Sequence, residues 1–284
     1  MTVAPETPST GATATVSGLL SAAYRHLAEV CGALTVTVSD PASGTPRTGV
    51  SGAELTKDAE ALGAFLGAED SRIRARYDHV PRRDVAASRA LHDYAWSVGL
   101  LMSGVWYLTG RVPRIRPEDI RIDLASGVFG ISPGPDLACL PADPAAALPG
   151  TLTVPHEEAL RAELRIAVAD HMEPLLSAMG PHVRRGPRAL WGLVTDDLVS
   201  GIWYLGRVLG REPDAVRAAT ALLPSAVPPF PGGADFRGLT GSDGRQHPTR
   251  TRMGCCLYYT IRPAEACATC PRTCDAERLR RIES

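Results

Sequence analysis

Five cysteines lie within the last thirty residues of this 284-residue chain, and they constrain its fold more than any other feature. An adjacent pair, Cys255 and Cys256, is followed after ten residues by Cys267, and two further residues separate Cys267 from Cys270. Four thiolates brought to one point hold either a zinc ion or an iron–sulfur cluster. The C-terminal end must therefore fold back on itself to gather these side chains, and we expect the functional site there.

The spacing of the cysteines favours an iron–sulfur cluster over zinc. Cys267 and Cys270 form a chelating C-x2-C pair, whereas Cys255 and Cys256 leave no room for the second C-x2-C pair that zinc ribbons usually carry. Neighbouring residues project in different directions, so the adjacent pair suits two separate irons, or one iron through a strained turn. Structural zinc held by four cysteines is the main alternative. Disulfides would need an oxidising compartment, and the polar N-terminus does not have the pattern of a secretory signal.

The cysteine segment resembles the C-terminal [2Fe–2S] motif of the ferric-siderophore reductases typified by FhuF. The similarity lies in the string Cys-Cys-Leu-Tyr-Tyr, the ten-residue and two-residue gaps that follow it, and Pro271 after the last cysteine of the motif. The stretch Arg250-Thr251-Arg252 is also similar to that family. By this resemblance the cluster ligands are Cys255, Cys256, Cys267 and Cys270.

A fifth cysteine, Cys274, departs from the family pattern, and we expect it to be spare. It completes a C-x2-C-x3-C run that superficially matches a [4Fe–4S] binder. That interpretation would leave the adjacent pair Cys255-Cys256 without a role, so a [2Fe–2S] cluster is preferred.

The resemblance implies a cytoplasmic oxidoreductase that passes one electron from a [2Fe–2S] cluster to siderophore-bound Fe(III) and releases Fe(II). Hard oxygen ligands favour Fe(III), so reduction weakens the complex. The implied substrate is a ferric siderophore, for example of the hydroxamate type. Because the sequence carries no glycine-rich dinucleotide fingerprint, we expect electrons to come from another protein, such as a ferredoxin or a flavin reductase.

Two other functions stay open at this point. A cluster-based redox or iron sensor would need an effector surface, such as a helix-turn-helix with a basic face, which the sequence does not show. A zinc-stabilised module would bind siderophores without reducing them. A brown colour after anaerobic purification would separate a cluster protein from a zinc protein.

Charge is distributed unevenly along the chain. The formal net charge is −1, which argues against nucleic acid as a partner, yet eight arginines and four acids lie between Arg245 and Ser284. We expect Arg250, Arg252 and Arg262 to dock a partner and to tune the cluster, with solvated surface arginines as the alternative. The pair Asp196-Asp197 is predicted to point outward from a helix or to pair with a nearby arginine.

The predicted fold is α+β, with a mainly helical body, a small and mostly antiparallel sheet, and a C-terminal iron–sulfur segment. Residues 1–14 are expected to be a disordered tail, 15–244 a substrate-binding body and 245–284 the cluster-binding segment. The proline-rich stretches Pro133–Gly150 and Pro224–Pro248 are predicted to be irregular. Helical patterns cover Val16–Cys31, Ser51–Leu66, Asp84–Thr109, His156–Met179, Pro187–Leu209 and Asp214–Leu222. Strand patterns cover Leu34–Val38, Ile120–Leu124, Val128–Ser132 and Thr151–Val154, with the middle two forming a hairpin.

Three smaller predictions concern these helices. The uncharged run between Asp93 and Arg111 has a helical apolar stripe with many small residues, so it predicts a buried core helix and no membrane span. The string Ser-Gly-Val-Trp-Tyr-Leu at 103–108 returns as Ser-Gly-Ile-Trp-Tyr-Leu at 200–205, which indicates a duplicated unit or two similar core helices; both predict mutual packing. His156 is expected to begin a helix and not to bind metal.

Overall fold

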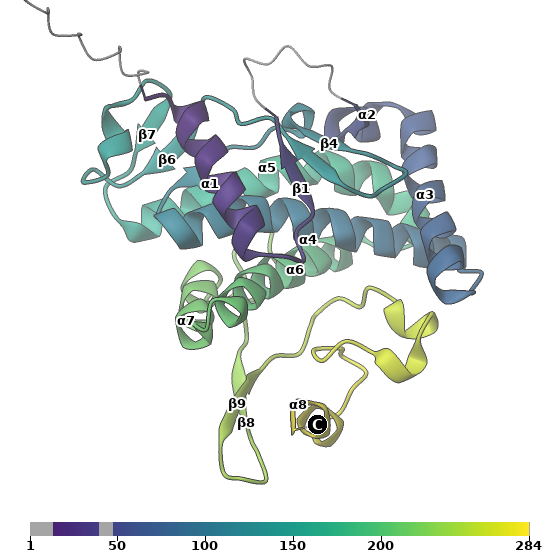
Figure 1. Ribbon diagram of the computed structural model, residues 1–284. Coiled ribbons are helices and arrows are strands. Elements are labelled where there is room, and N and C mark those ends of the chain that lie inside the picture. The colour runs from purple at the N-terminus through teal and green to yellow at the C-terminus, as the bar shows by residue number, and fades with distance from the viewer. Residues whose placement is uncertain (1–13, 40–47, 284) are drawn as a thin grey trace, which may run out of the picture.

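The computed structural model describes residues 14–39 and 48–283, so the predicted tail lies outside the described residues except for residue 14. The body is helical with small sheets at its edge, which confirms the predicted α+β class (Figure 1). The helices are α1 (Val16–Val30), α2 (Gly52–Lys57), α3 (Ala59–Tyr77), α4 (Arg83–Thr109), α5 (Glu157–Val183), α6 (Pro187–Val208), α7 (Glu212–Leu222) and α8 (Asp275–Glu283). The strands are β1 (Val36–Val38), β2 (Val50–Ser51), β3 (Val112–Pro113), β4 (Ile120–Ile122), β5 (Phe129–Ile131), β6 (Leu137–Cys139), β7 (Thr151–Thr153), β8 (Arg237–Thr240) and β9 (Gln246–Thr249).

The strands form three small sheets, which are mostly antiparallel. The largest has the order β1-β5-β4-β2, in which β4 and β5 make the predicted hairpin and β1 runs parallel to β5. The hairpin turns at Asp123, whose carboxylate accepts hydrogen bonds from the backbone N–H groups of Ala125 and Ser126, and at Gly127, which has a φ of 74°. The other sheets are β3-β6-β7 and the hairpin β8-β9.

The two stretches predicted to be irregular contain strands. The prediction for 133–150 is wrong at β6, which pairs in parallel with β7 and antiparallel with β3. The prediction for 224–248 is wrong at β8 and β9, which pair over four residues each. β6 and β8 contain no proline and β9 contains only Pro248, so the proline-rich composition of these stretches concealed short strands between the prolines.

Helix α4 is the centre of the core. Most of its side chains are buried, and it packs against α1, α3, α5 and α6. The predicted core helix is thus confirmed, and none of the described helices is both long enough and apolar enough to cross a membrane. The two repeated Ser-Gly-x-Trp-Tyr-Leu strings lie on α4 and α6, which pack together as expected. At their contact, a Cβ atom on Gly201 would lie 3.5 Å from Leu100, so the small residue allows the two helices to approach closely.

Local capping explains where several helices begin and end. The predicted helix 51–66 is divided because Asp58 ends α2 and caps α3, where its carboxylate accepts a hydrogen bond from the N–H of Glu60. His156 caps α5, as predicted: its Nδ1 accepts a hydrogen bond from the N–H of Ala159 over 3.1 Å.

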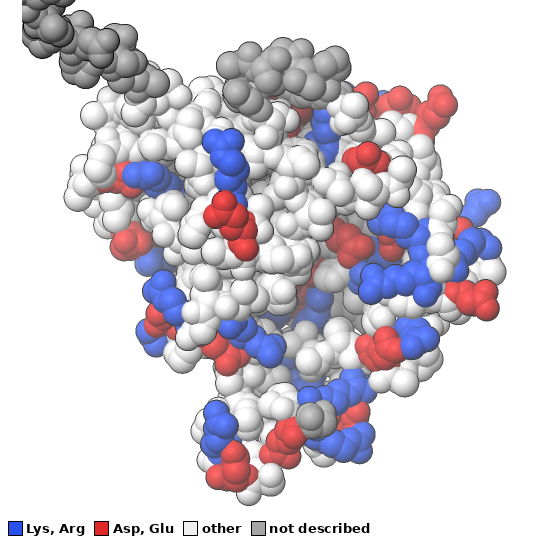
Figure 2. All heavy atoms as spheres, in the orientation of Figure 1, with Lys and Arg blue, Asp and Glu red and all other residues white. Residues whose placement is uncertain are grey.

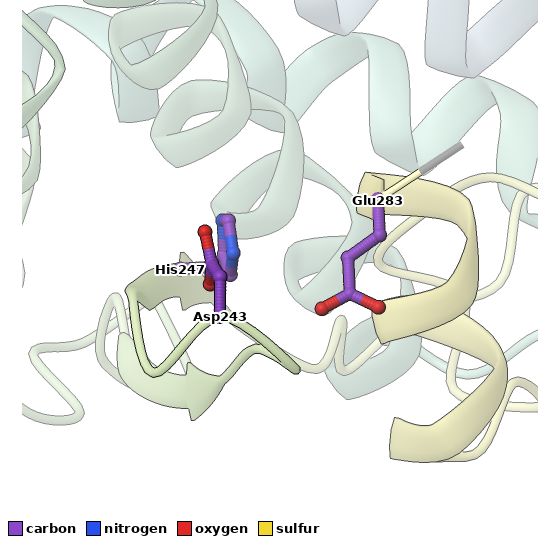
Figure 3. A group of neighbouring side chains, drawn as sticks. All are labelled: Asp243, His247 and Glu283. Atoms are coloured by element: carbon purple, nitrogen blue, oxygen red, sulfur yellow. The ribbon is translucent and has the colours of Figure 1, made fainter.

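The chain after α7 lies against one side of the helical body and ends in α8 (Figure 1). Arg237 on β8 donates two hydrogen bonds, of 2.8 and 2.6 Å, to the carboxylate of Asp275 at the start of α8. At the other end, Glu283 meets the β8-β9 turn beside Asp243 and His247, and it accepts a hydrogen bond from the N–H of Ser242 over 2.6 Å (Figure 3). Hairpin and helix therefore brace the segment that carries the cysteines.

Candidate metal centre and the cavity beside it

The four predicted ligands lie in an irregular segment between β9 and α8. After Cys255 and Cys256 the chain turns sharply at Leu257, which has a left-handed φ of 62°. Two short 3-10 turns, Tyr258–Thr260 and Pro263–Glu265, then lead to Cys267. A further turn follows, in which the N–H of Cys270 donates to the carbonyl of Cys267 over 2.9 Å. The segment has little regular structure, so side-chain contacts must hold it.

The structure brings together the four cysteines that the sequence predicted. Cys256 and Cys270 are buried, and Cys255 and Cys267 are half-buried. The thiols of Cys256 and Cys267 are hydrogen-bonded, and both Cys255 and Cys267 feel the charges of Cys256 and Cys270. We call these four residues the thiol group.

Cys274 stands apart from the thiol group. It is exposed, and its carbonyl accepts a hydrogen bond from the N–H of Arg278 over 3.0 Å, so it begins α8. Its role as the spare cysteine stays a prediction.

The thiol group supplies the four sulfur ligands that either metal centre would need. A single zinc ion would take all four sulfurs at about 2.3 Å, whereas in a two-iron cluster each iron takes two of them. In residues 14–39 and 48–283, Asp243, His247 and Glu283 form the trio whose ligand atoms all lie within 4.8 Å of one another, and this trio contains no thiol.

Basic side chains from α4, together with Arg252 from the C-terminal segment itself, lie near Cys256. A hydrogen bond from Cys267, together with the charges of His92, Arg89 and Arg252, lowers the pKa of the Cys256 thiol to about 4 although burial opposes this shift. Arg89 also donates a hydrogen bond to the Cys256 sulfur. Because the thiolate is the form that binds metal, these residues prepare the site for it.

Two arginines upstream of the cysteines are buried and anchor the segment to α6. Arg250 is fully buried; it donates to the carboxylate of Asp196 over 2.6 Å and to the carbonyl of Ala234 over 2.8 Å. Asp196 also accepts a hydrogen bond from the N–H of Gly254 over 2.6 Å, one residue before the first cysteine. Arg252 pairs with Asp197 in the same way.

These contacts correct two predictions. Arg250 has no exposed surface to offer a docking partner, and Arg252 is 5 % exposed, so their main role is to pair with buried acids. Asp196 and Asp197 do form the predicted ion pairs with arginine, but they point into the protein and not outward. The acids and the arginines can both be buried because they pair with one another: a charged group is tolerated in a core when a counter-charge and hydrogen bonds accompany it.

Asp197 links the segment to α4 as well. Its carboxylate lies 2.7 Å from Nδ1 of His92 and also accepts from Arg252. Burial alone would raise its pKa, but His92 and Arg252 outweigh burial and hold the pKa of Asp197 below its usual range. The acid is therefore a charged link between α4, α6 and the cysteine segment.

Sequence reasoning missed four residues that hold the site. Arg89 and His92 lie one turn apart on α4, and Arg185 donates to the carbonyl of Cys255 over 2.6 Å. Arg278 is buried and donates to the carbonyls of Arg250 and Cys270 over 3.0 and 2.8 Å. No sequence pattern marked these four basic residues. The one available signal was the pair Asp196-Asp197 inside an apolar helix, because buried acids need basic side chains as partners.

A cavity of about 630 Å³ opens beside the thiol group. Ala268 and Thr269, the two residues between Cys267 and Cys270, form part of its wall together with Arg252. In Figure 2, basic side chains border the hollow between α3 and the C-terminal segment. The remaining wall comes from α3, α4, α6 and the β1-β5-β4 sheet, and includes Arg72, Arg76, His92, Trp96, Phe129, Trp203, Tyr204 and Arg207.

Comparison with known families agrees with this geometry. Residues 252–272 match the family model of the FhuF 2Fe-2S C-terminal domain, a range that contains the whole thiol group. No curated protein matches the chain. Residues 252–272 are therefore of the FhuF 2Fe–2S type, and the cofactor of this stretch is a [2Fe–2S] cluster.

Proposed function

We propose that this protein is a ferric-siderophore reductase, which passes one electron from its [2Fe–2S] cluster to siderophore-bound Fe(III) and thereby releases Fe(II). The observation that carries the proposal is the shared wall: Ala268 and Thr269 lie between two cysteines of the thiol group and also line the cavity. Its volume falls within the roughly 300–1,000 Å³ of ligand-binding pockets. A chelate bound there would lie directly beside the cluster.

The proposed cluster ligands are Cys255, Cys256, Cys267 and Cys270. When bound, the cluster supplies electrons one at a time, which matches the step from Fe(III) to Fe(II). The chain's own residues set the conditions for this step. Arg89 and Arg252 offset the negative charge of the thiolates, and Arg185 and Arg278 fix the backbone on either side of the group. Charge and hydrogen bonds of this kind set the reduction potential of a cluster.

The proposal includes a substrate, an electron donor and a location. The substrate is a ferric siderophore, for example of the hydroxamate type, and its hard oxygen donors hold Fe(II) less tightly than Fe(III). The donor is another protein, such as a ferredoxin or a flavin reductase. The reaction takes place in the cytoplasm, where thiol ligands stay reduced. Arg262 is exposed and pairs with Glu265 over 3.0 Å, and we keep it as a docking residue for the donor.

The test is a single-turnover reaction without oxygen. The protein is reduced with dithionite, freed of excess reductant and mixed with a ferric siderophore in a stopped-flow instrument. We expect the cluster absorption to return to its oxidised form while a ferrous-specific chelator gains colour in a one-to-one ratio. A Cys274→Ser variant should behave as wild type.

Two results would contradict the proposal. One is a reduced cluster that stays reduced in the presence of every ferric chelate of a broad panel. The other is protein that contains one zinc ion and no acid-labile sulfide after anaerobic preparation, which would favour a zinc-stabilised binding module.

A further inference from the structure

We infer that the cavity beside the cluster selects negatively charged ferric siderophores, and that Arg76 and Arg207 are the residues that recognise their carboxylate groups. This inference rests on the proposed function, because it names the class of substrate for the same site. Two observations support it: the charged residues that line the cavity are mostly arginines, and only some of these arginines form a close ion pair with an acid of the protein.

The cavity wall carries a clear excess of positive charge. Four arginines line it, namely Arg72, Arg76, Arg207 and Arg252, against a single acid, Asp93. The acid is already engaged, because its carboxylate accepts a hydrogen bond from Arg89 over 2.8 Å. A ligand therefore meets a positive interior.

Two of the four arginines are committed to the protein. Arg72 forms an ion pair with Glu69 across 2.5 Å, and Arg252 pairs with the buried Asp197. Each of these acids is at most 6 % exposed in its side chain, so it stays with its arginine when a ligand enters. Arg72 and Arg252 therefore form part of the cavity wall, and their guanidinium groups are not available as the main partners of a ligand carboxylate.

Arg76 and Arg207 have aromatic neighbours but no close carboxylate. Arg76 is exposed and its guanidinium lies over the Tyr77 ring, 5.3 Å from the centroid; within the described part of the chain no carboxylate lies within 4.0 Å of it. Arg207 is 62 % exposed, lies 5.8 Å from the centroid of the Trp203 ring and 3.9 Å from Glu212, whose carboxylate already accepts a hydrogen bond of 2.7 Å from the indole N–H of Trp203. A guanidinium that lies over a ring keeps its N–H groups at the edge, where two of them can bind a carboxylate in parallel.

The apolar part of the cavity suits the body of a chelate. Trp96 and Tyr204 meet edge to face with ring centroids 5.8 Å apart, and both line the cavity. Tyr204 is 37 % exposed, so its ring is accessible to a ligand in the cavity. Such rings accept the carbon chain of a siderophore while the arginines hold its charged groups.

Charge can be varied without changing the iron centre. A linear siderophore with three hydroxamates leaves Fe(III) neutral, so a pendant amine makes the complex a cation, an acetylated amine makes it neutral and a succinylated amine makes it an anion. The three complexes share one coordination sphere. Differences among them therefore report the field of the cavity and not the stability of the iron complex.

The experiment measures binding of this series with Ga(III) in place of Fe(III), so that no electron transfer occurs. By calorimetry on the holoprotein at low salt, we expect the anion to bind about tenfold more tightly than the cation, a factor that shrinks at 1 M salt where the Debye length is about 3 Å. In an Arg76→Gln/Arg207→Gln variant the three dissociation constants should converge. The matched control, Arg217→Gln/Arg245→Gln, removes two exposed arginines outside the cavity and should keep the ranking.

The outcomes separate this inference from the proposed function. Equal affinities across the series, or a ranking that survives in the Arg76→Gln/Arg207→Gln variant, would overturn charge selection. If the Fe(III) members are then all reduced at one rate, the reductase stands and the inference about charge fails. If the Ga(III) members rank by charge but reduced protein transfers no electron to the Fe(III) members, the cavity chemistry stands and the reductase fails.

Discussion

The change Asp196→Asn should destabilise this protein strongly although it replaces only one carboxylate oxygen with an NH2 group. Asp196 is fully buried on α6, and its two oxygens serve different parts of the cysteine segment. One accepts a hydrogen bond from the Arg250 guanidinium and the other from the N–H of Gly254, both over 2.6 Å. An asparagine has the same shape but offers one oxygen and one NH2 group.

The expected magnitude follows from these two contacts. The NH2 group of asparagine must face either Arg250 or Gly254, so two donors meet and one buried donor loses its partner, at about 1–3 kcal/mol. The buried guanidinium of Arg250 also loses its counter-charge, and breaking a buried ion pair in this way costs about 3–5 kcal/mol in all. We expect a loss of unfolding free energy within that range. Because Gly254 precedes Cys255, the cluster should also be released more readily.

The assay is urea unfolding of holoprotein, followed by far-ultraviolet circular dichroism and by the visible absorption of the cluster. The control is Asp214→Asn on α7, the same exchange at an acid whose side chain is 38 % exposed and pairs with Arg211 and Arg217. Exposed pairs contribute at most about 1 kcal/mol, so the control should unfold close to wild type. If Asp196→Asn also unfolds within about 1 kcal/mol of wild type and keeps its cluster, the buried ion pairs do not hold the segment.

The remaining predictions concern the cluster, pH and the repeated strings. Serine at any residue of the thiol group should remove or distort a cluster of about two irons and two sulfides per chain, while Cys274→Ser keeps it, as iron and acid-labile sulfide analysis will show. His171 is buried between the Tyr94 hydroxyl and the Ile115 carbonyl, and burial lowers its pKa from 6.5 to about 4. The unfolded chain therefore binds a proton at His171 that the folded chain does not, so His171 alone should lower stability by about 3 kcal/mol as pH drops from 6.5 towards 4. Burial raises the pKa of Glu69 to about 7, which contributes the opposite slope in part of this range, so the His171 contribution is read as the difference between wild type and His171→Gln in urea titrations at a series of pH values. His26→Gln, at an exposed histidine, should keep the wild-type slope. Trp106→Ala removes a buried ring and should lower the free energy of unfolding by about 3–5 kcal/mol. Trp203 lines the cavity, so Trp203→Ala should lower the free energy of unfolding by less and should weaken chelate binding. Equal losses of stability in the two variants would argue against a cavity role for Trp203.

Local patterns predicted most of the helical body. The bounds of α1, α4 and α6 agree with the apolar pattern within a residue or so. The pattern is local because each of these helices buries apolar side chains along its whole length, on most sides in the case of α4. The β4-β5 hairpin was predicted from its turn residues, and His156 from its position at a helix start. Strands β6, β8 and β9 were missed because they lie in or next to proline-rich stretches without clear alternation, and they are recognised only from the partner strands with which they pair.

The sequence by itself identified the cofactor segment of this protein. The spacing of Cys255, Cys256, Cys267 and Cys270 indicated the metal-binding segment and its type of cluster, because the motif is continuous in the chain and lies between residues 252 and 272. The tertiary structure alone decided the surroundings. Whether an arginine lies in the core or faces a cavity depends on which distant residue meets it: Asp196 on α6 buries Arg250, while Arg76 on α3 and Arg207 on α6 come together around one hollow. Such contacts join segments more than fifty residues apart, and the charges carry no local signal of their partners.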